Sequence, residues 1–219
     1  MILELKKVSK HLDLKKRSYS VKEATFSLLQ GQSLAILGAN PTGSLDLMKL
    51  IAGAIYPSQG TIVRHGCSLA VIGDSLTFHR ELTGEQNMRF LCKLYGASAK
   101  TIIPKVATFT GLSALFKKKT KSYTPQQKRK IALTLPLFLD VDIYVINGNI
   151  GHPDAKFSSR YNELFTEKIL NRTLIIHSAD LDFIKKHASA AAIVHDNGDV
   201  VFKDVIAEGL DEYKKVNAS

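Results

Sequence analysis

The sequence predicts an α/β fold with a mostly parallel sheet at its core, and three observations indicate it. The short apolar run Ser33–Gly38 has the composition of a strand that is buried on both faces, and Ile143–Ile146 gives a further strand signal. Helical patterns separate such runs along the chain, and that alternation is typical of a parallel sheet. The block from Thr83 to about Leu139 has helical periodicity, which indicates a helical insertion.

Strands, a glycine loop and a helix are predicted for the first third of the chain. Gln30-Gly31-Gln32 has the composition of a turn, and the loop that starts at Gly38 leads into a helix that ends near Ala54. The order of elements around this loop is therefore strand, glycine loop, helix. The predicted strands of this part are Ile2–Val8, about Tyr19–Leu28, Ser33–Gly38, Thr61–Arg64 and Leu69–Ile72.

Helices dominate the middle of the chain, and strands return after it. Pro125 suits the first turn of a helix, and we expect Asp204 to cap a last helix near the end of the sequence. The other predicted helices are Gly84–Tyr95, Lys100–Phe109 and about Ala155–Leu170, and the helix from Pro125 extends to Leu139. The later strands are Ile143–Ile146, Leu174–Ile176, Ala190–His195 and Val200–Phe202, with a turn at 196–199.

No internal repeat and no linker-like stretch divides the sequence, so a single domain over residues 1–219 is the simplest prediction. Within it we expect a core at 1–75 and 140–219 and a helical subdomain at 76–139. With 45% hydrophobic and 23% charged residues, the composition is that of a globular protein.

Thirty basic residues against twenty acidic ones give a formal charge of +10, which favours an anionic neighbour. The basic residues cluster at Lys15–Arg17, Lys117–Lys121 and Lys128–Lys130. Such clusters are typical of a solvated face or of contact with a membrane surface, and the sequence leaves both open. Nucleic acid is not expected as a partner, because aromatic residues are not interleaved with the basic ones as single-strand binding would favour.

The sequence also limits where in the cell we expect the protein to lie. No apolar run reaches the roughly 18 to 20 residues that a membrane span needs, and the first residues lack the layout of a signal peptide. We therefore expect a soluble, cytoplasmic protein. Cys67 and Cys92 lie in unrelated segments without metal-ligand spacing, so free buried thiols are expected.

The loop after the third strand keeps the two-glycine frame of the phosphate-binding P-loop, G-x-x-x-x-G-K-[ST]. In a working P-loop the backbone N–H groups wrap the phosphates, lysine reaches the outer phosphates and the hydroxyl ligates magnesium. Here Ser44 stands at the lysine position and Leu45 at the hydroxyl position. By itself, this frame is more typical of an ordinary turn. The loop consists of Gly38, Ala39, Asn40, Pro41, Thr42, Gly43, Ser44 and Leu45.

Five further segments carry a family resemblance together with this loop: Leu82–Gly96, Lys121–Leu133, Ile143–Gly148, Gly151–Phe157 and Leu174–Ser178. In them, and along its whole length, the chain resembles the ATP-binding subunits of ABC transporters, and most of all those of capsular-polysaccharide exporters. In that class the five segments correspond, in order, to the opening of the helical subdomain, the signature motif with its helix, the Walker B strand, the D-loop and the switch histidine.

The resemblance implies a P-loop NTPase fold of the ABC ATPase type, with a mostly parallel sheet core, an antiparallel β-subdomain and a helical subdomain. It implies a transmembrane permease as partner, and a homodimer or a heterodimer with an intact ABC ATPase. It also implies a position at the cytoplasmic face of the inner membrane.

At the positions where the family carries its catalytic groups, this sequence departs from the pattern. The Walker B aspartate and glutamate are replaced by Asn147 and Gly148, so magnesium binding is not expected and no carboxylate can orient the attacking water. His177 matches the switch histidine; it either contacts phosphate as in the family or is a hydrogen-bonded core residue. We expect ATP to bind weakly or not at all.

Other motif positions are altered as well. Thr124-Pro125-Gln126-Gln127 replaces the small residues of the signature motif, which disfavours close backbone approach to a phosphate. The adenine-stacking position falls at His11 or Leu12, and His79 matches the Q-loop position. Asp154 of the D-loop is kept, and we expect it to cap a helix or to serve dimer geometry.

These departures predict a degenerate ATP-binding subunit, a pseudo-ATPase associated with polysaccharide export. Two alternatives stay open. The chain could be a transport ATPase that is active only with an intact partner chain, or a scaffold or regulator that binds an anionic partner through its basic clusters.

Overall fold

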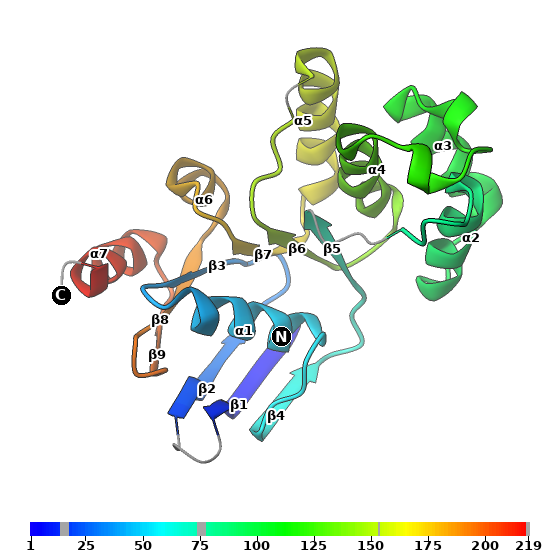
Figure 1. Ribbon diagram of the computed structural model, residues 1–219. Helices are drawn as coiled ribbons and strands as arrows, with labels where there is room; N and C mark the ends of the chain where they lie inside the picture. The colour runs from blue at the N-terminus through cyan, green and yellow to red at the C-terminus, as the bar shows by residue number, and fades with distance from the viewer. Residues whose placement is uncertain (14–17, 74–77, 153, 218–219) are drawn as a thin grey trace. The chain divides into compact units, whose positions relative to one another are not determined.

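The computed structural model describes residues 1–13, 18–73, 78–152 and 154–217, which form two compact units (Figure 1). The first unit comprises residues 1–69, 142–149 and 171 to the C-terminus, and the second comprises 70–141 and 150–170. The helix after residue 154 is thus part of the second unit. The basic cluster Lys15–Arg17 lies outside the described residues. The division into a core and a helical subdomain at 76–139 stays a prediction.

An antiparallel sheet of the first unit has the strand order β2-β1-β4. Its strands are β1 (Leu3–Asp13), β2 (Ser18–Leu28) and β4 (Gln59–Arg64). The prediction that the first strand ends at Val8 was wrong, because β1 continues to Asp13. Shifts of register interrupt its pairing with β2 after Leu5, and Lys7 has a positive φ of 47°. These irregularities break the period-two pattern on which the predicted boundary rested.

The core sheet of the first unit runs in the order β6-β7-β3-β8-β9. The first four of these strands are parallel to one another, and β9 is antiparallel to β8. The strands are β3 (Ser33–Gly38), β6 (Ile143–Asn147), β7 (Thr173–His177), β8 (Ala190–Val194) and β9 (Val200–Lys203). The four parallel strands are nearly continuously buried, which confirms the burial predicted for Ser33–Gly38 on both faces, whereas β9 is half-buried throughout. The predicted mostly parallel α/β core is confirmed.

Three helices belong to the first unit: α1 (Pro41–Ala52), α6 (Leu181–His187) and α7 (Ile206–Asn217). Helix α6 was not predicted; Asp180 caps it by accepting a hydrogen bond from the backbone N–H of Phe183 at 2.9 Å. Helix α7 begins at Ile206, so Asp204 lies one residue before the capping position and the prediction that it caps this helix was wrong.

The second unit is mainly helical, as predicted. It contains β5 (Leu69–Gly73) and the helices α2 (Gly84–Leu94), α3 (Ala99–Thr110), α4 (Pro125–Phe138) and α5 (Ala155–Ile169). Every one of these helices lies within two residues of its predicted bounds. The expectation that Asp154 caps a helix is confirmed, since its carboxylate accepts a hydrogen bond from the N–H of Phe157 at 3.0 Å.

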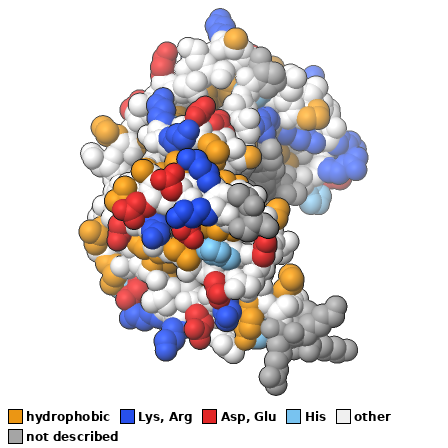
Figure 2. Space-filling model, turned by 90° about the vertical axis from the view of Figure 1, so that its left-hand side faces the viewer, with side chains coloured by type: hydrophobic (Ala, Val, Ile, Leu, Met, Phe, Trp, Pro, Cys, Tyr) orange, Lys and Arg blue, Asp and Glu red, His pale blue; other side chains and the backbone are white. Residues whose placement is uncertain are grey.

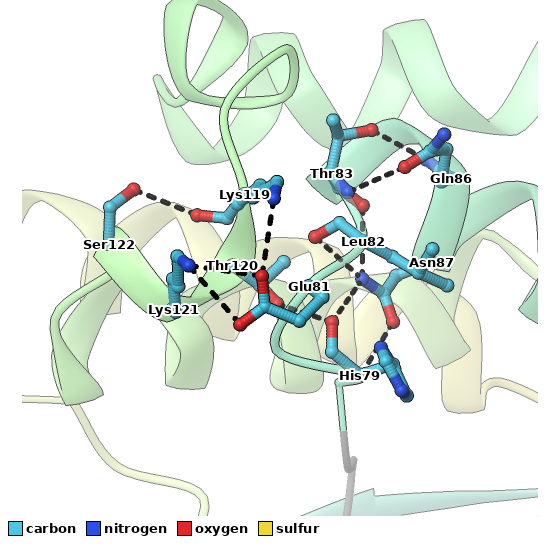
Figure 3. Close-up of polar contacts among 10 residues, drawn as sticks. All are labelled: His79, Glu81, Leu82, Thr83, Gln86, Asn87, Lys119, Thr120, Lys121 and Ser122. Atoms are coloured by element: carbon cyan, nitrogen blue, oxygen red, sulfur yellow. Dashed lines mark hydrogen bonds and ion pairs between the residues drawn. The ribbon is translucent and has the colours of Figure 1, made fainter.

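One buried amide organises the start of the helical unit (Figure 3). Asn87 is 5% exposed; its Oδ1 accepts from the N–H of His79 at 2.8 Å, and its Nδ2 donates to the carbonyls of His79 and Thr83 at 3.2 and 3.0 Å. Glu81 then pairs with Lys119 and Lys121 at 3.2 and 3.0 Å. The segment before α2 is therefore fixed to the segment before α4.

Two further observations concern the charged side chains on the surface and the two cysteines. On the face that Figure 2 shows, Lys and Arg side chains lie among Asp and Glu side chains, so basic and acidic groups are mixed there. Both cysteines are free thiols; Cys92 is buried, but Cys67 is only half-buried, so the expectation of two buried thiols was wrong for Cys67.

Within the described ranges, no helix combines the length and the apolar character that crossing a membrane requires.

Candidate functional site

A cavity of about 330 Å³ opens in the first unit where three parallel strands end. Strands β3, β6 and β7 each supply their carboxyl-terminal residues, and the carboxyl ends of parallel strands are where α/β sheets bind ligands. Among the described residues, no Asp, Glu, Lys or Arg lines this cavity. Histidine is therefore the only titratable side chain of the usual charged types among the described lining residues, and the rest of the lining is largely apolar. The lining residues are Ile36, Leu37, Gly38, Pro41, Ser44, Asn147, Gly148, His177, Ser178, Ala179 and Tyr213.

His177 joins two of the predicted site positions through its ring. Its Nδ1 lies 3.2 Å from Oδ1 of Asn147, and its Nε2 lies 3.2 Å from Oγ of Ser44. Asn147 and His177 are register partners in the β6-β7 ladder, which holds the two side chains side by side. The three residues at the lysine, aspartate and histidine positions of the resembled motifs are thus brought together and hydrogen-bonded to one another.

The contact with Asn147 sets the role of one ring nitrogen. Oδ1 of Asn147 can only accept, so Nδ1 of His177 carries the proton, and in the neutral ring Nε2 is an acceptor for the Ser44 hydroxyl. The carbonyl oxygens of Asn40 and Pro41, at 3.4 and 3.2 Å, compete with Nε2 for the single proton of that hydroxyl. Burial lowers the pKa of His177 below its ordinary value, because the charged form loses hydration. The neutral ring is therefore the favoured form at pH 7.

The backbone N–H groups of the loop donate hydrogen bonds to an acceptor within the loop itself. Oδ1 of Asn40 accepts hydrogen bonds from the N–H groups of Thr42 and Gly43 at 2.9 and 3.3 Å, and the N–H of Ser44 donates to the carbonyl of Asn40 at 3.2 Å. Pro41 at the first helical position has no N–H to offer. Helix α1 consequently begins inside the two-glycine frame, with the donors at its N-terminus already satisfied.

Packing accounts for the second glycine of the frame. A Cβ atom added at Gly43 would lie 2.6 Å from the carbonyl oxygen of Ser20 and 2.8 Å from Cγ1 of Val194. A side chain at Gly43 would therefore displace β2 or β8. Neither Gly38 nor Gly43 has a positive φ. The alternation of right- and left-handed residues that forms an anion-binding nest is thus absent between these two glycines.

Gly148 follows β6 in a left-handed conformation, with φ of 84°. Its N–H donates to the carbonyl of His177 at 2.8 Å, which fixes this conformation. No heavy atom lies within 4 Å of the place where its Cβ would be. A larger residue would have space there, but its backbone would be strained.

Several predicted positions do not line the cavity. Five residues of the loop and of the first turns of α1 are not among the lining residues: Ala39, Asn40, Thr42, Gly43 and Leu45. His11 stacks on Tyr19 with ring centroids 4.5 Å apart, and Leu12 is 57% exposed. Neither of the two adenine-stacking candidates contributes to the lining.

Sequence reasoning missed Tyr213, which lines the cavity from α7. No local pattern singles it out, because it lies far along the chain from the loop and only the packing of α7 brings it there. Ser178 was noted only as the neighbour of His177, and Ala179 was not noted.

The remaining predicted positions belong to the second unit. Thr124 begins α4 in a reciprocal capping box: its hydroxyl accepts from the N–H of Gln127 at 3.2 Å, and Oε1 of Gln127 accepts from the N–H of Thr124 at 2.9 Å. These side chains serve the start of a helix. His79 is fixed through its backbone (Figure 3). Asp154 pairs with Lys130 at 2.6 Å, and this pairing lowers the pKa of Asp154 to about 2.

Comparison with known proteins finds relatives of the kind that the sequence motifs predicted. No protein-family model matches the chain. It is 25% identical over 200 residues to the polysialic acid transport ATP-binding protein KpsT of Escherichia coli, covering 90% of this chain and 89% of that protein. It is 29% identical over 178 residues to the ATP-binding protein BexA of Haemophilus influenzae, covering 81% and 82%.

A solved structure of an ATP-binding subunit of an ABC transporter superposes with a TM-score of 0.82 at 20% identity, covering all of both chains. This similarity establishes the fold. The predicted P-loop NTPase fold of the ABC ATPase type is confirmed, and so is the resemblance to capsule-export ATP-binding proteins.

Proposed function

We propose that this chain, which has the fold of ABC-transporter ATP-binding subunits and resembles those of capsular-polysaccharide exporters, is a degenerate subunit of such an exporter that does not hydrolyse ATP by itself. The observation that carries the proposal is the hydrogen-bonded series Ser44–His177–Asn147, together with the loop amides that Asn40 already satisfies. In this arrangement the groups at the nucleotide positions bind one another.

The residues present do not fit magnesium and ATP. A divalent cation at Asn147 would meet a neutral amide instead of a carboxylate, and an outer phosphate at Ser44 would meet a hydroxyl instead of an ammonium group. The N–H groups of Thr42 and Gly43, which a phosphate would need, donate to Asn40. Binding a phosphate here requires that the Asn40 cap break.

Magnitudes support weak or absent binding. A charge-assisted hydrogen bond contributes about 1.5 to 3 kcal/mol, so losing the lysine and the metal together removes about 3 to 6 kcal/mol. This weakens ATP binding by about 10² to 10⁴-fold relative to an intact site. For catalysis, each missing charge-stabilising group costs about 10² to 10³ in rate.

The proposal includes partners. A subunit that does not hydrolyse ATP can still hold the position of an ATP-binding subunit on a transmembrane permease at the cytoplasmic face of the inner membrane. An intact ABC ATPase chain would then supply the hydrolysis. The resemblance over nearly the full length of the relatives supports this arrangement.

Affinity purification of the tagged chain from detergent-solubilised membranes, followed by mass spectrometry, tests the proposal. We expect a permease and a second ATP-binding protein with complete motifs to copurify, and the isolated chain to show only background ATP hydrolysis. Turnover by the isolated chain at the rate of an ordinary ABC subunit would contradict the proposal. Recovery without any permease would favour the scaffold alternative.

A further inference from the structure

A second cavity, of about 220 Å³, lies wholly in the helical unit and carries charge. Its lining includes the cationic side chains of Lys130, Lys156 and Arg160 and the single carboxylate of Asp154. Lys130 is the least exposed of the cations, with 17% of its side chain accessible, and it pairs with Asp154 at 2.6 Å. The charges of Lys156 and Arg160 therefore have no carboxylate of their own in the cavity lining.

The two remaining cations have no anionic partner in the described part of the chain. Neither Lys156 nor Arg160 makes a hydrogen bond or ion pair there, and the guanidinium of Arg160 lies 4.8 Å from the ring centroid of Phe109. A guanidinium held over an aromatic ring keeps its donors directed outward for a planar or tetrahedral oxyanion.

The position of Lys156 strengthens this point. It lies in the first turn of α5, and that turn contains no acidic residue. The N-terminus of a helix carries partial positive charge, and the Asp154 carboxylate at the capping position offsets it while also pairing with Lys130. With three cations against this one carboxylate, the cavity lining keeps a formal excess of two positive charges.

We propose that this cavity binds a phosphate group. The oxyanion would contact the ammonium of Lys156 and the guanidinium of Arg160, while the rings of Phe109 and Phe157, whose centroids are 6.0 Å apart, would contact the organic part of the ligand. Lys130 stays bound to Asp154. The site is independent of the function proposed above, because it uses none of the residues around Ser44 and His177.

Calorimetry of the full-length chain in phosphate-free buffer tests the site, with inorganic phosphate and glycerol 3-phosphate as probes. Arg160→Gln and Lys156→Gln should each weaken binding by about tenfold, since each removes one charge-assisted contact. Lys168→Gln is the matched control, because it removes the same charge from α5 at a residue that pairs with Glu167 outside the cavity. The control should retain the affinity of the unmodified chain.

Sedimentation with vesicles distinguishes the source of the phosphate. Phosphatidylglycerol vesicles that bind the chain in an Arg160-dependent manner, with no binding of the soluble probes, would assign the site to a lipid headgroup, and binding of the soluble probes would assign it to a free phosphate ester. Phosphatidylcholine vesicles serve as the neutral control. Absence of saturable binding to every probe, or equal weakening in Lys168→Gln, would overturn the proposal. If Arg160→Gln fails to fold, Lys156→Gln decides.

Discussion

Nε2 of His177 lies 3.2 Å from the hydroxyl oxygen of Ser44, although 133 positions separate the two residues in the sequence. Strand β7 brings the histidine to the loop that precedes α1, and Asn147 completes the series from β6. The ring nitrogens are thereby satisfied inside the protein. A site built in this way is stable without a ligand, and its stability can be measured directly.

Replacing Asn147 tests the series at its far end. Asn147→Ala leaves the proton on Nδ1 of His177 without a partner in a half-buried place, so the free energy of unfolding should fall by about 1 to 3 kcal/mol. Urea unfolding measures this loss. Asn162→Ala, at an exposed position of α5, is the control and should change stability by less than about 0.5 kcal/mol. Equal losses in the free energy of unfolding for the two variants would show that the hydrogen-bonded series Ser44–His177–Asn147 does not stabilise the protein.

Stability should depend on pH through His177. Burial lowers its pKa from the ordinary 6.5, so the unfolded chain binds a proton at higher pH than the folded protein does. The free energy of unfolding should therefore be complete above pH 6.5 and fall as the pH drops toward the lowered pKa.

The pKa of His187 is also lowered, by burial and by Lys186, so each histidine needs its own variant. Urea unfolding across this pH range should show a flatter profile for His177→Gln than for the unmodified chain, and the double variant with His187→Gln should be flatter still. A profile that His177→Gln leaves unchanged would contradict the assignment.

The cap of α1 can be tested against an uncapped helix in the same protein. Asn40→Ala removes the acceptor for two N–H groups and should cost about 1 kcal/mol. Ser98 occupies the same position of α3, but its side chain makes no capping hydrogen bond. Ser98→Ala should therefore cost clearly less in the same thermal or urea unfolding experiment. A cost for Asn40→Ala no larger than that of Ser98→Ala would be inconsistent with a loop whose amides are satisfied by Asn40.

Restoring the missing glutamate should not restore hydrolysis. Gly148→Glu forces a side chain onto a residue with φ of 84°, at a cost of about 1 to 2 kcal/mol. Gly148→Asn should cost less, because asparagine tolerates this conformation better. Phosphate-release assays should leave Gly148→Glu at background, since Ser44 and Asn147 are unchanged. Measurable turnover would mean that the glutamate alone had been lacking.

The parallel core could be predicted from the sequence because its strands are buried on both faces and separated by periodic helices. Ile143–Ile146, for example, is a continuous apolar run and was placed within one residue of β6. Helix α6 escaped prediction because its seven residues are too few to establish a period. The end of β1 was misplaced because its irregular pairing hides the alternation beyond Val8.

The sequence predicted several residues of the site, but it did not predict the hydrogen bonds among them. The family pattern placed Ser44, Asn147 and His177 near one another, but the hydrogen bonds among them depend on the register of β6 and β7. The cap at Asn40 did leave a local signal, since asparagine followed by proline is typical of the capping and first positions of a helix. Tyr213 left none, because its place at the cavity depends only on tertiary packing.

Titration of the purified chain with ATP and magnesium by calorimetry tests the central claim most directly. The satisfied series Ser44–His177–Asn147 and the capped loop predict no saturable heat up to millimolar nucleotide, consistent with a loss of about 3 to 6 kcal/mol in binding free energy. A magnesium-dependent dissociation constant of about 10 μM or tighter would contradict the account.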